Sequence, residues 1–385
     1  MLNFSFKNAT AIHFGEGQIK KVTREIPLTA KVLVIYGGGS IKSNGVYDQV
    51  VTALANHTWC EFSGIEPNPK YDTLIKAQTL IKNENIDYLL AVGGGSVVDG
   101  AKFIAAAALF EGDDPWDILA KQQPVKQALP LGAILTLPAT GSESNGNSVV
   151  TRDGNKLGFS SPLVCPTFAV LDPSVTLSLS DRQISNGVVD AFIHVMEQYL
   201  NYSVNGKVQD RFSEGLLMTL IEEGPKALSE NSKADISVRA NIMWSATMAL
   251  NGLIGAGVPQ DWSTHMIGHE LTGAYGIDHA RTLSIVLPAV MKVCRAAKRE
   301  KLLQYAERVW QITEGDENSR IDQAIALTES FFETMQVPTR LSQVDIGEDK
   351  IDGLIERLKQ HGMIALGENK DITPEVSRKI LMQAL

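Results

Sequence analysis

The chain has 385 residues, of which 44% are hydrophobic, so we expect one large or two ordinary folded domains and exclude a disordered protein. The formal net charge is −9 and no basic stripe occurs, which argues against a nucleic-acid partner. Three widely spaced cysteines favour a reducing compartment without a disulfide framework. The N-terminus lacks the pattern of a signal peptide, and the longest apolar run, 103–110, is too short to span a membrane. We therefore expect a cytoplasmic protein with no membrane partner.

The first half of the chain alternates between strand and helix patterns. Segments 31–40 and 88–109 each begin with a β-branched or aliphatic run and continue into three glycines and a serine. The segment between them, 71–87, has the apolar spacing of a helix, and further apolar runs lie at 131–138 and 168–173. Continuous apolar strands separated by helices are typical of a parallel sheet that is buried on both faces. We expect an open α/β domain over residues 1–179.

The pattern changes at Ser180. Ser180 and Gln183 have the spacing of a capping box, which predicts the start of a helix. From there to the end of the chain the apolar spacing is helical, and no further strand followed by a glycine turn occurs. The sequence predicts an all-helical second domain over residues 180–385.

The turn Gly93-Gly94-Gly95-Ser96 stands where a predicted strand becomes a helix, with Asp99 three residues later. Backbone N–H groups at a helix N-terminus favour a bound anion, and glycine allows the backbone to approach a pyrophosphate. The pattern differs from the spaced GxGxxG fingerprint of dinucleotide-binding proteins. The alternative is a tight strand-to-helix turn that binds nothing.

A second turn, Gly37-Gly38-Gly39-Ser40, follows the strand that begins at Lys31. An acidic side chain near this point commonly binds the ribose of NAD, but the nearest acid downstream is Asp48. Small groups with Lys42 close by leave room for a 2′-phosphate, which favours NADP(H). A third loop, 136–148, is rich in hydroxyl and amide side chains that suit phosphate, ribose and carboxamide groups, as an ordinary polar loop also would.

Histidines and a carboxylate suggest a metal site in the second half. Asp190 and His194 are four residues apart in a helical pattern, so both can reach one cation, although an ordinary hydrogen-bonded pair has the same spacing. His265, His269 and His279 lie within fifteen residues. Two of these three histidines would complete a set of three nitrogens and one oxygen, which suits Zn²⁺ or Fe²⁺. Spacing alone favours His265 and His269, and the sequence does not decide between the pairs.

Four stretches together resemble the iron-containing (group III) alcohol dehydrogenase family. They are "EPNPKYDTL", "GGGSVVDGAK", "FAVLDPSVTLSLSDRQISNGVVDAFIHVMEQYL" and "HMIGHELTGAYGIDHA". The stretches "ALNGLIGAGVPQDW" and "KLLQYAERVW" are similar to its NADPH-dependent aldehyde reductase and butanol dehydrogenase branch. The resemblance implies a Rossmann-like α/β nucleotide-binding domain followed by an all-α domain, the fold of dehydroquinate synthase.

The resemblance also implies a role for individual residues. Asp190, His194, His265 and His279 match the metal ligands, and His269 matches a histidine near the metal that is not usually a ligand. We expect His269 to pass a proton. Further positions at the two glycine turns and in the polar loop are expected to bind NADP(H): Gly37, Gly38, Gly39, Ser40, Gly94, Gly95, Ser96, Asp99, Thr136, Thr140, Asn147 and Lys156.

The resulting hypothesis is a metal-dependent alcohol dehydrogenase that transfers hydride between NADP(H) and a short- to medium-chain aldehyde or alcohol, as a homodimer with one Zn²⁺ or Fe²⁺ per site. Three alternatives remain at this point. They are a lyase of the dehydroquinate synthase type, an NAD-dependent polyol dehydrogenase, and a nucleotide-binding protein without catalysis. The lyase would need basic residues for its phosphate and carboxylate substrate, and no such cluster stands out.

Overall fold

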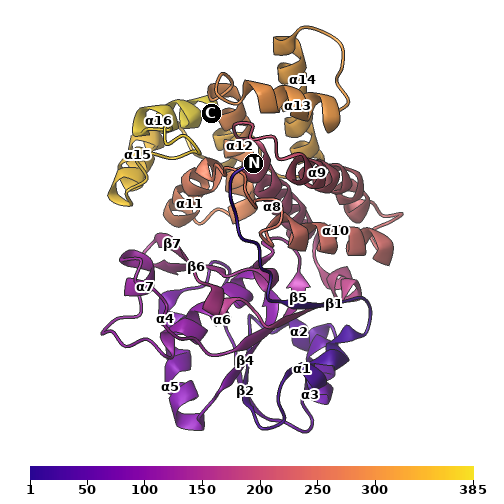
Figure 1. Cartoon of the computed structure of the whole chain (residues 1–385), viewed down its shortest axis with the longest axis vertical. Coiled ribbons are helices and arrows are strands. Elements are labelled where there is room, and N and C mark those ends of the chain that lie inside the picture. Colours follow the sequence, from indigo (N-terminus) through magenta and orange to yellow (C-terminus); the bar gives the residue numbers. More distant parts are fainter. The chain divides into compact units, whose positions relative to one another are not determined.

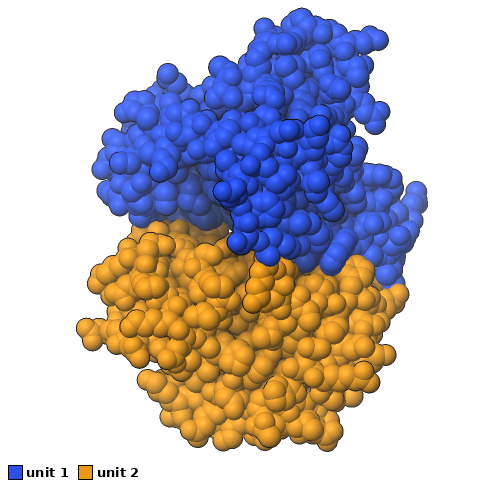
Figure 2. Space-filling view, viewed as in Figure 1, with its two compact units in different colours: residues 1–6, 180–385 blue, residues 7–179 orange.

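The computed structural model describes all 385 residues of the chain. They divide into two compact units, one of residues 7–179 and one that joins residues 1–6 to residues 180–385 (Figure 2). The first six residues, which the sequence pattern places in the first domain, group with the helical unit. There the backbone N–H of Leu2 donates to the carbonyl of Gly257 at 2.9 Å.

The unit of residues 7–179 is built on a parallel sheet, as predicted. The sheet has six strands in the order β1-β8-β5-β4-β2-β3, of which β1 and β3 were not predicted. Its strands are β1 Ala11–Phe14, β2 Lys31–Tyr36, β3 Thr58–Phe62, β4 Tyr88–Gly94, β5 Leu131–Leu137 and β8 Phe168–Leu171, and β6 Asn147–Arg152 with β7 Asn155–Ser160 forms an antiparallel hairpin. Its helices are η1 Gln18–Lys21, α1 Val22–Glu25, α2 Ser40–Ser43, α3 Val46–Ala53, α4 Tyr71–Leu74, α5 Lys76–Glu84, α6 Gly95–Ala107, α7 Asp117–Ala120, η2 Ser142–Ser144, η3 Pro162–Val164 and η4 Pro173–Ser178.

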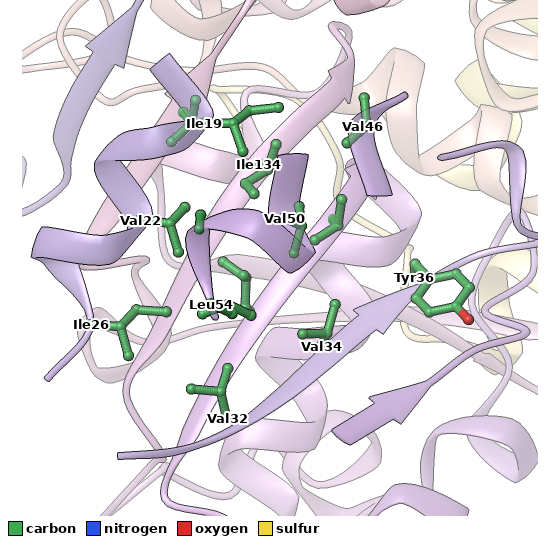
Figure 3. Packing of buried hydrophobic residues seen from close by; sticks show 14 of the residues in the cluster. Ile19, Val22, Ile26, Val32, Val34, Tyr36, Val46, Val50, Leu54 and Ile134 are labelled. Carbon is green, nitrogen blue, oxygen red and sulfur yellow. The ribbon is translucent and has the colours of Figure 1, made fainter. Parts of the chain in front are cut away.

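Both faces of the sheet are buried, because helices cover each of them (Figure 1). Alternate residues of a strand point to opposite faces. Val32, Val34 and Tyr36 of β2 therefore pack on one face with residues of α1 and α3, such as Val22 (Figure 3). The intervening residues of β2 are also fully buried. This two-sided burial explains why the strands read as continuous apolar runs rather than as alternating patterns.

The order of the strands reverses between β2 and β4. The chain passes from β2 to β3 on one side and then crosses to β4 on the other side of β2. In open α/β sheets, ligands bind in the crevice outside the carboxyl ends of the strands at such a switch point. The two glycine turns predicted to bind a nucleotide lie at the ends of these two strands, at Gly37–Gly39 after β2 and at Gly94–Gly95, where β4 ends and α6 begins.

The other unit is helical, as the sequence predicts. Its helices are α8 Asp181–Tyr199, α9 Lys207–Leu228, α10 Ile236–Ala249, α11 Ser263–Tyr275, α12 His279–Val293, α13 Arg299–Arg308, α14 Glu317–Thr334, η5 Leu341–Val344, η6 Glu348–Lys350, α15 Ile351–Gln360 and α16 Pro374–Gln383. No helix in the structure has both the length and the apolar character that crossing a membrane requires.

Helix α8 is the central element of this unit. It begins with the predicted capping box, in which the Gln183 side chain accepts from the Ser180 backbone at 3.1 Å and the Ser180 hydroxyl accepts from the Gln183 backbone. Every residue from Val188 to Tyr199 is buried, because α8 packs against α9, α10 and α12. Polar side chains on this stretch therefore lie inside the protein, where each needs a partner.

Candidate metal centre and nucleotide-binding turns

Helix α8 places Asp190 and His194 one turn apart, and both side chains are buried. Oδ1 of Asp190 lies 3.8 Å from Nδ1 of His194, which is too far for a hydrogen bond. These two atoms have no hydrogen-bond partner in the structure. A buried carboxylate oxygen without a partner is costly, and a bound cation would satisfy it.

Two more histidines face this pair from neighbouring helices. His265 lies in the first turn of α11, and its Nε2 is 3.1 Å from Nε2 of His194. His279 is the first residue of α12, and its Nε2 is 3.6 Å from Oδ1 of Asp190. Asp190, His265 and His279 each offer one ligand atom, and these atoms all lie within 4.8 Å of one another.

The donor set fits a tetrahedral cation. Two imidazole nitrogens that bind the same Zn²⁺ at the usual bond length lie about 3.3 Å apart, close to the observed separation of the His194 and His265 nitrogens. Burial lowers the pKa of His194 to about 4. Its imidazole is therefore neutral near pH 7, which is the form that binds metal.

His269 lies near this set but outside the group of three donors. It follows His265 by one turn on α11, and its half-buried ring is 5.1 Å from the ring of His279 and 6.2 Å from that of His265, measured between centroids. This placement fits the predicted role beside the metal, although spacing alone favoured His269 as a ligand.

Glu197, on the same helix as Asp190, is a further buried group that sequence reasoning did not assign a role. Its Oε2 is hydrogen-bonded to Nδ1 of His265, and its Oε1 accepts from the backbone N–H of Thr264 at 2.6 Å. Burial, with the nearby Asp261 carboxylate, raises the pKa of the Glu197 carboxyl. The available signal in the sequence was that Glu197 lies about one helical turn after His194. Its partner His265, however, is 68 residues further along the chain, so the sequence alone does not reveal the contact.

The start of α12 is also tied to α8. Asp278, directly before His279, accepts hydrogen bonds from Nε of Arg182 at 2.8 Å and from Nδ2 of Asn186 at 2.9 Å. These charge-assisted bonds lower the pKa of the Asp278 carboxyl despite its partial burial. They fix the backbone that carries His279 relative to the helix that carries Asp190.

In the other unit, the turn after β2 has an open surface. Gly39 adopts a φ of 95°, in the left-handed region that favours glycine, and Ser40 then begins α2. A Cβ on Gly38 or on Gly39 would have no neighbouring atom within 4 Å. Gly37 is more enclosed, because its Cβ would lie 3.1 Å from the carbonyl of Ile65. A ligand can therefore approach the Gly38 and Gly39 backbone directly.

The turn after β4 packs against the polar loop. A Cβ on Gly95 would come within 2.5 Å of Oγ1 of Thr140, so only glycine fits there. Asp99, predicted to contact the cofactor, directs its carboxylate to this loop. There it accepts from the Ser142 hydroxyl and, at 3.0 Å, from the Val149 backbone. Ser96 Oγ accepts from the Asn68 backbone at 3.3 Å.

The remaining predicted contacts come from the loop and the hairpin. Thr136 lies near the end of β5, Asn147 begins β6, and Lys156 lies in β7 opposite Thr151. In the parallel pairing of β4 with β5, Gly94 lies opposite Leu137, so the carboxyl ends of these strands are adjacent. The structure thus brings the second glycine turn and the polar loop together within this unit.

Lys102 on α6 is a residue that sequence reasoning missed. It is fully buried, and its Nζ donates to Oγ of Ser142 at 2.8 Å, to Oδ1 of Asn145 at 3.0 Å and to the carbonyl of Asn147 at 2.7 Å. Burial lowers its pKa to about 8, against the opposing effect of Asp99. A single lysine inside the apolar stretch 101–110 was the available signal. Lys102 and Asp99 together hold the polar loop on α6.

The fold and the donor set are those of a metal-dependent dehydrogenase, and the chain belongs to the iron-containing alcohol dehydrogenase family. The family model described as "Iron-containing alcohol dehydrogenase" matches residues 9–173. The model described as "Fe-containing alcohol dehydrogenase family, C-terminal" matches residues 184–381.

Among individual relatives, the chain is 57% identical over 384 residues to the NADPH-dependent aldehyde reductase YqhD of Escherichia coli, covering 99% of both chains. It is 39% identical to a probable NADH-dependent butanol dehydrogenase of Bacillus subtilis over the full length of both. The crystal structure of E. coli YqhD matches with a TM-score of 0.98 and 56% identity, covering 100% of this chain and 99% of the other. That of NADH-dependent butanol dehydrogenase A from Thermotoga maritima matches with a TM-score of 0.95 and 36% identity, covering 100% and 99%.

Proposed function

We propose that this protein is an NADPH-dependent aldehyde reductase that converts short- to medium-chain aldehydes to alcohols and catalyses the reverse reaction. The observation that carries the proposal is the set of Asp190, His194, His265 and His279, of which only His279 is half-buried. Donor atoms of Asp190, His265 and His279 lie within 4.8 Å of one another, and Nε2 of His194 lies 3.1 Å from Nε2 of His265. Family membership and the name of the 57% identical relative support the same activity.

When bound at this set, a divalent cation would supply Lewis-acid polarisation of the carbonyl oxygen, and a bound nicotinamide would supply the hydride. The chain's own residues would hold the cation, orient the reactants and protonate the product. Asp190 and the three histidines would bind the cation, which is Zn²⁺ or Fe²⁺ by the chemistry of the donors. His269, beside His279, would deliver the proton that the product alcohol oxygen needs.

The nucleotide would bind at the carboxyl ends of β2, β4 and β5. Gly38 and Gly39 leave the backbone accessible and provide no carboxylate for a ribose 2′-hydroxyl. The second turn contributes Gly94, Gly95 and Ser96, and the remaining contacts would come from Gly37, Ser40, Asp99, Thr136, Thr140, Asn147 and Lys156. The turn itself contains no acid, which favours NADP(H) over NAD(H), and the nearby Glu61 carboxylate is paired with Lys42 at 3.1 Å.

The decisive experiment removes the metal with a chelator and rebuilds the protein with Zn²⁺ or Fe²⁺. NADPH and NADH oxidation is then followed with butanal, other short aldehydes and a glycerol-type carbonyl substrate. We expect activity only after rebuilding, with NADPH and an aldehyde as the better pair. Preference for NADH and a polyol substrate would indicate the polyol dehydrogenase alternative, and nucleotide binding without metal would indicate a protein without catalysis.

His265→Ala tests the ligand set directly. We expect the variant to lose bound metal, measured by elemental analysis, together with activity, because one of four ligands is gone. A variant that keeps both would show that His265 is not a ligand.

We also propose that the protein is a cytoplasmic homodimer. All three cysteines are free thiols in the structure, which is consistent with a reducing compartment. Light scattering coupled to size-exclusion chromatography would measure the mass of the assembly, for which we expect twice the 41.8 kDa of one chain.

A further inference from the structure

The N-terminus of α11, which carries His265, is only partly capped by the segment before it, where Oδ1 of Asp261 accepts from the backbone N–H of Ser263 at 2.9 Å. The residue before it, Trp262, has a φ of 65°, and its side chain accepts no hydrogen bond from the helix. The first N–H groups of a helix need acceptors, and buried ones need them most. Here Oε1 of Glu197 accepts from the backbone of Thr264 at 2.6 Å and of His265 at 3.4 Å. A side chain from α8 thus caps α11.

The same glutamate contacts the ring of His265. Oε2 of Glu197 is hydrogen-bonded to Nδ1, while Nε2 on the opposite side of the ring faces Nε2 of His194 at 3.1 Å. A neutral imidazole carries one N–H and one lone pair. When Nδ1 carries the proton and donates a hydrogen bond to a carboxylate, Nε2 keeps the lone pair and points it to where the other donors converge. Carboxylate partners of this kind fix the tautomer and orientation of histidine ligands.

We propose that Glu197 is a positioning residue for the metal site: it orients His265 through both its ring and its backbone and holds the tautomer that can bind a cation. The inference rests on the proposed assignment of His265 as a ligand. Since Glu197 shares α8 with Asp190 and His194, one helix presents two ligands and fixes the third. Glu197 is 2% exposed and does not belong to the converging donor set itself.

The test compares Glu197→Gln with the matched control Glu214→Gln. Glu214 is a buried glutamate of α9 that accepts hydrogen bonds from Tyr199 and Arg308. Neither of these partners is one of the four proposed metal ligands. In Glu197→Gln, the single amide oxygen cannot replace both carboxylate oxygens, one of which accepts from the backbone and the other of which faces Nδ1, and an amide N–H₂ facing Nδ1 favours the wrong tautomer. On chelator-stripped full-length protein, competition with a chromophoric chelator should show a Zn²⁺ dissociation constant raised about 10- to 100-fold. The control should bind as the wild type does.

A second measurement uses the wild-type protein, so it does not require that a variant folds. In Zn²⁺-loaded wild-type protein, the ¹⁵N shifts of His265 should show a protonated Nδ1 and a metal-bound Nε2. The opposite tautomer would overturn the proposal, as would an unchanged dissociation constant in Glu197→Gln or an equal loss in Glu214→Gln. If His265→Ala itself binds Zn²⁺ with wild-type affinity, the proposed ligand set fails instead, so the two failures are distinguishable.

Discussion

His265 and His269 are adjacent on one helix face, yet their surroundings differ. The ring of His265 is buried and bonded to Glu197, with Nε2 close to another histidine nitrogen. His269 is half-buried, and its ring lies beside that of His279. A ligand must be held rigidly, whereas a group that moves a proton must reach both the substrate and a proton source. These differences favour His269 as the proton donor.

His269→Ala should therefore retain metal and lose rate. We expect wild-type metal content and a fall in kcat of about 10²- to 10⁴-fold, the usual contribution of general acid catalysis. Elemental analysis and steady-state kinetics measure the two quantities. His13→Ala is a control, since His13 is a partly buried histidine bonded to Glu25 in the other unit. Loss of metal from His269→Ala would make it a ligand.

The buried Lys102 predicts a dependence of stability on pH. Its pKa falls from 10.5 to about 8 on folding. Between these values the unfolded chain holds a proton that the folded protein has released, so the free energy of unfolding rises with pH. The rise attributable to Lys102 is up to about 3 kcal/mol.

Urea unfolding of the wild type and of Lys102→Met at pH 7, 8.5 and 10 gives the free energy of unfolding of each protein as a function of pH. The difference between the two proteins isolates the effect of Lys102, because groups that both proteins share cancel. We expect the wild type to gain stability relative to the variant above pH 8. Parallel curves would show that Lys102 does not titrate in this range.

At the scale of elements, the segments proposed to bind the nucleotide lie at the carboxyl ends of strands. The glycine turns follow β2 and β4 at the switch point of the sheet, and the polar loop follows β5. Asp99 and Lys102 of α6 bond to that loop, and Gly95 allows Thr140 to approach. Helix α6 thus serves as the support on which the loop is placed.

Gly95→Ala should disturb this contact. The new Cβ would overlap the Thr140 side chain, and overpacking of this kind typically costs about 1–3 kcal/mol. Chemical denaturation measures the loss. Gly38→Ala is the matched control, since a Cβ there meets no atom and the glycine does not have a positive φ. Equal stability of the two variants would contradict the packing argument.

At the scale of the whole molecule, each unit has its own core and its own part of the chemistry. The sheet unit carries the turns proposed to bind the nucleotide, and the helical unit carries the proposed metal ligands, which converge from α8, α11 and α12. Since α8 is distant in the chain from α11 and α12, a bound cation would link segments that are separate in sequence. Such a ligand stabilises the folded state by mass action.

Removal of the metal should therefore lower stability as well as activity. At a free metal concentration 100 to 1,000 times the dissociation constant, bound metal adds about 3–4 kcal/mol to the free energy of unfolding. Thermal unfolding with and without chelator should show a lower Tm for the stripped protein. His265→Ala should show no such difference, and an equal shift in both proteins would mean that the chelator acts elsewhere.

The sequence by itself determined the two architectures, the family and the cap of α8, because these depend on local patterns of apolar spacing, turn residues and motifs. It also proposed Asp190 with His194, since four residues make one helical turn. Only the tertiary structure decided how His265 and His279 face that pair and how Glu197 and Lys102 act. These contacts join residues 40 or more positions apart, such as Glu197 with His265 and Lys102 with Ser142, and only the packing of distant helices, strands and loops brings them together.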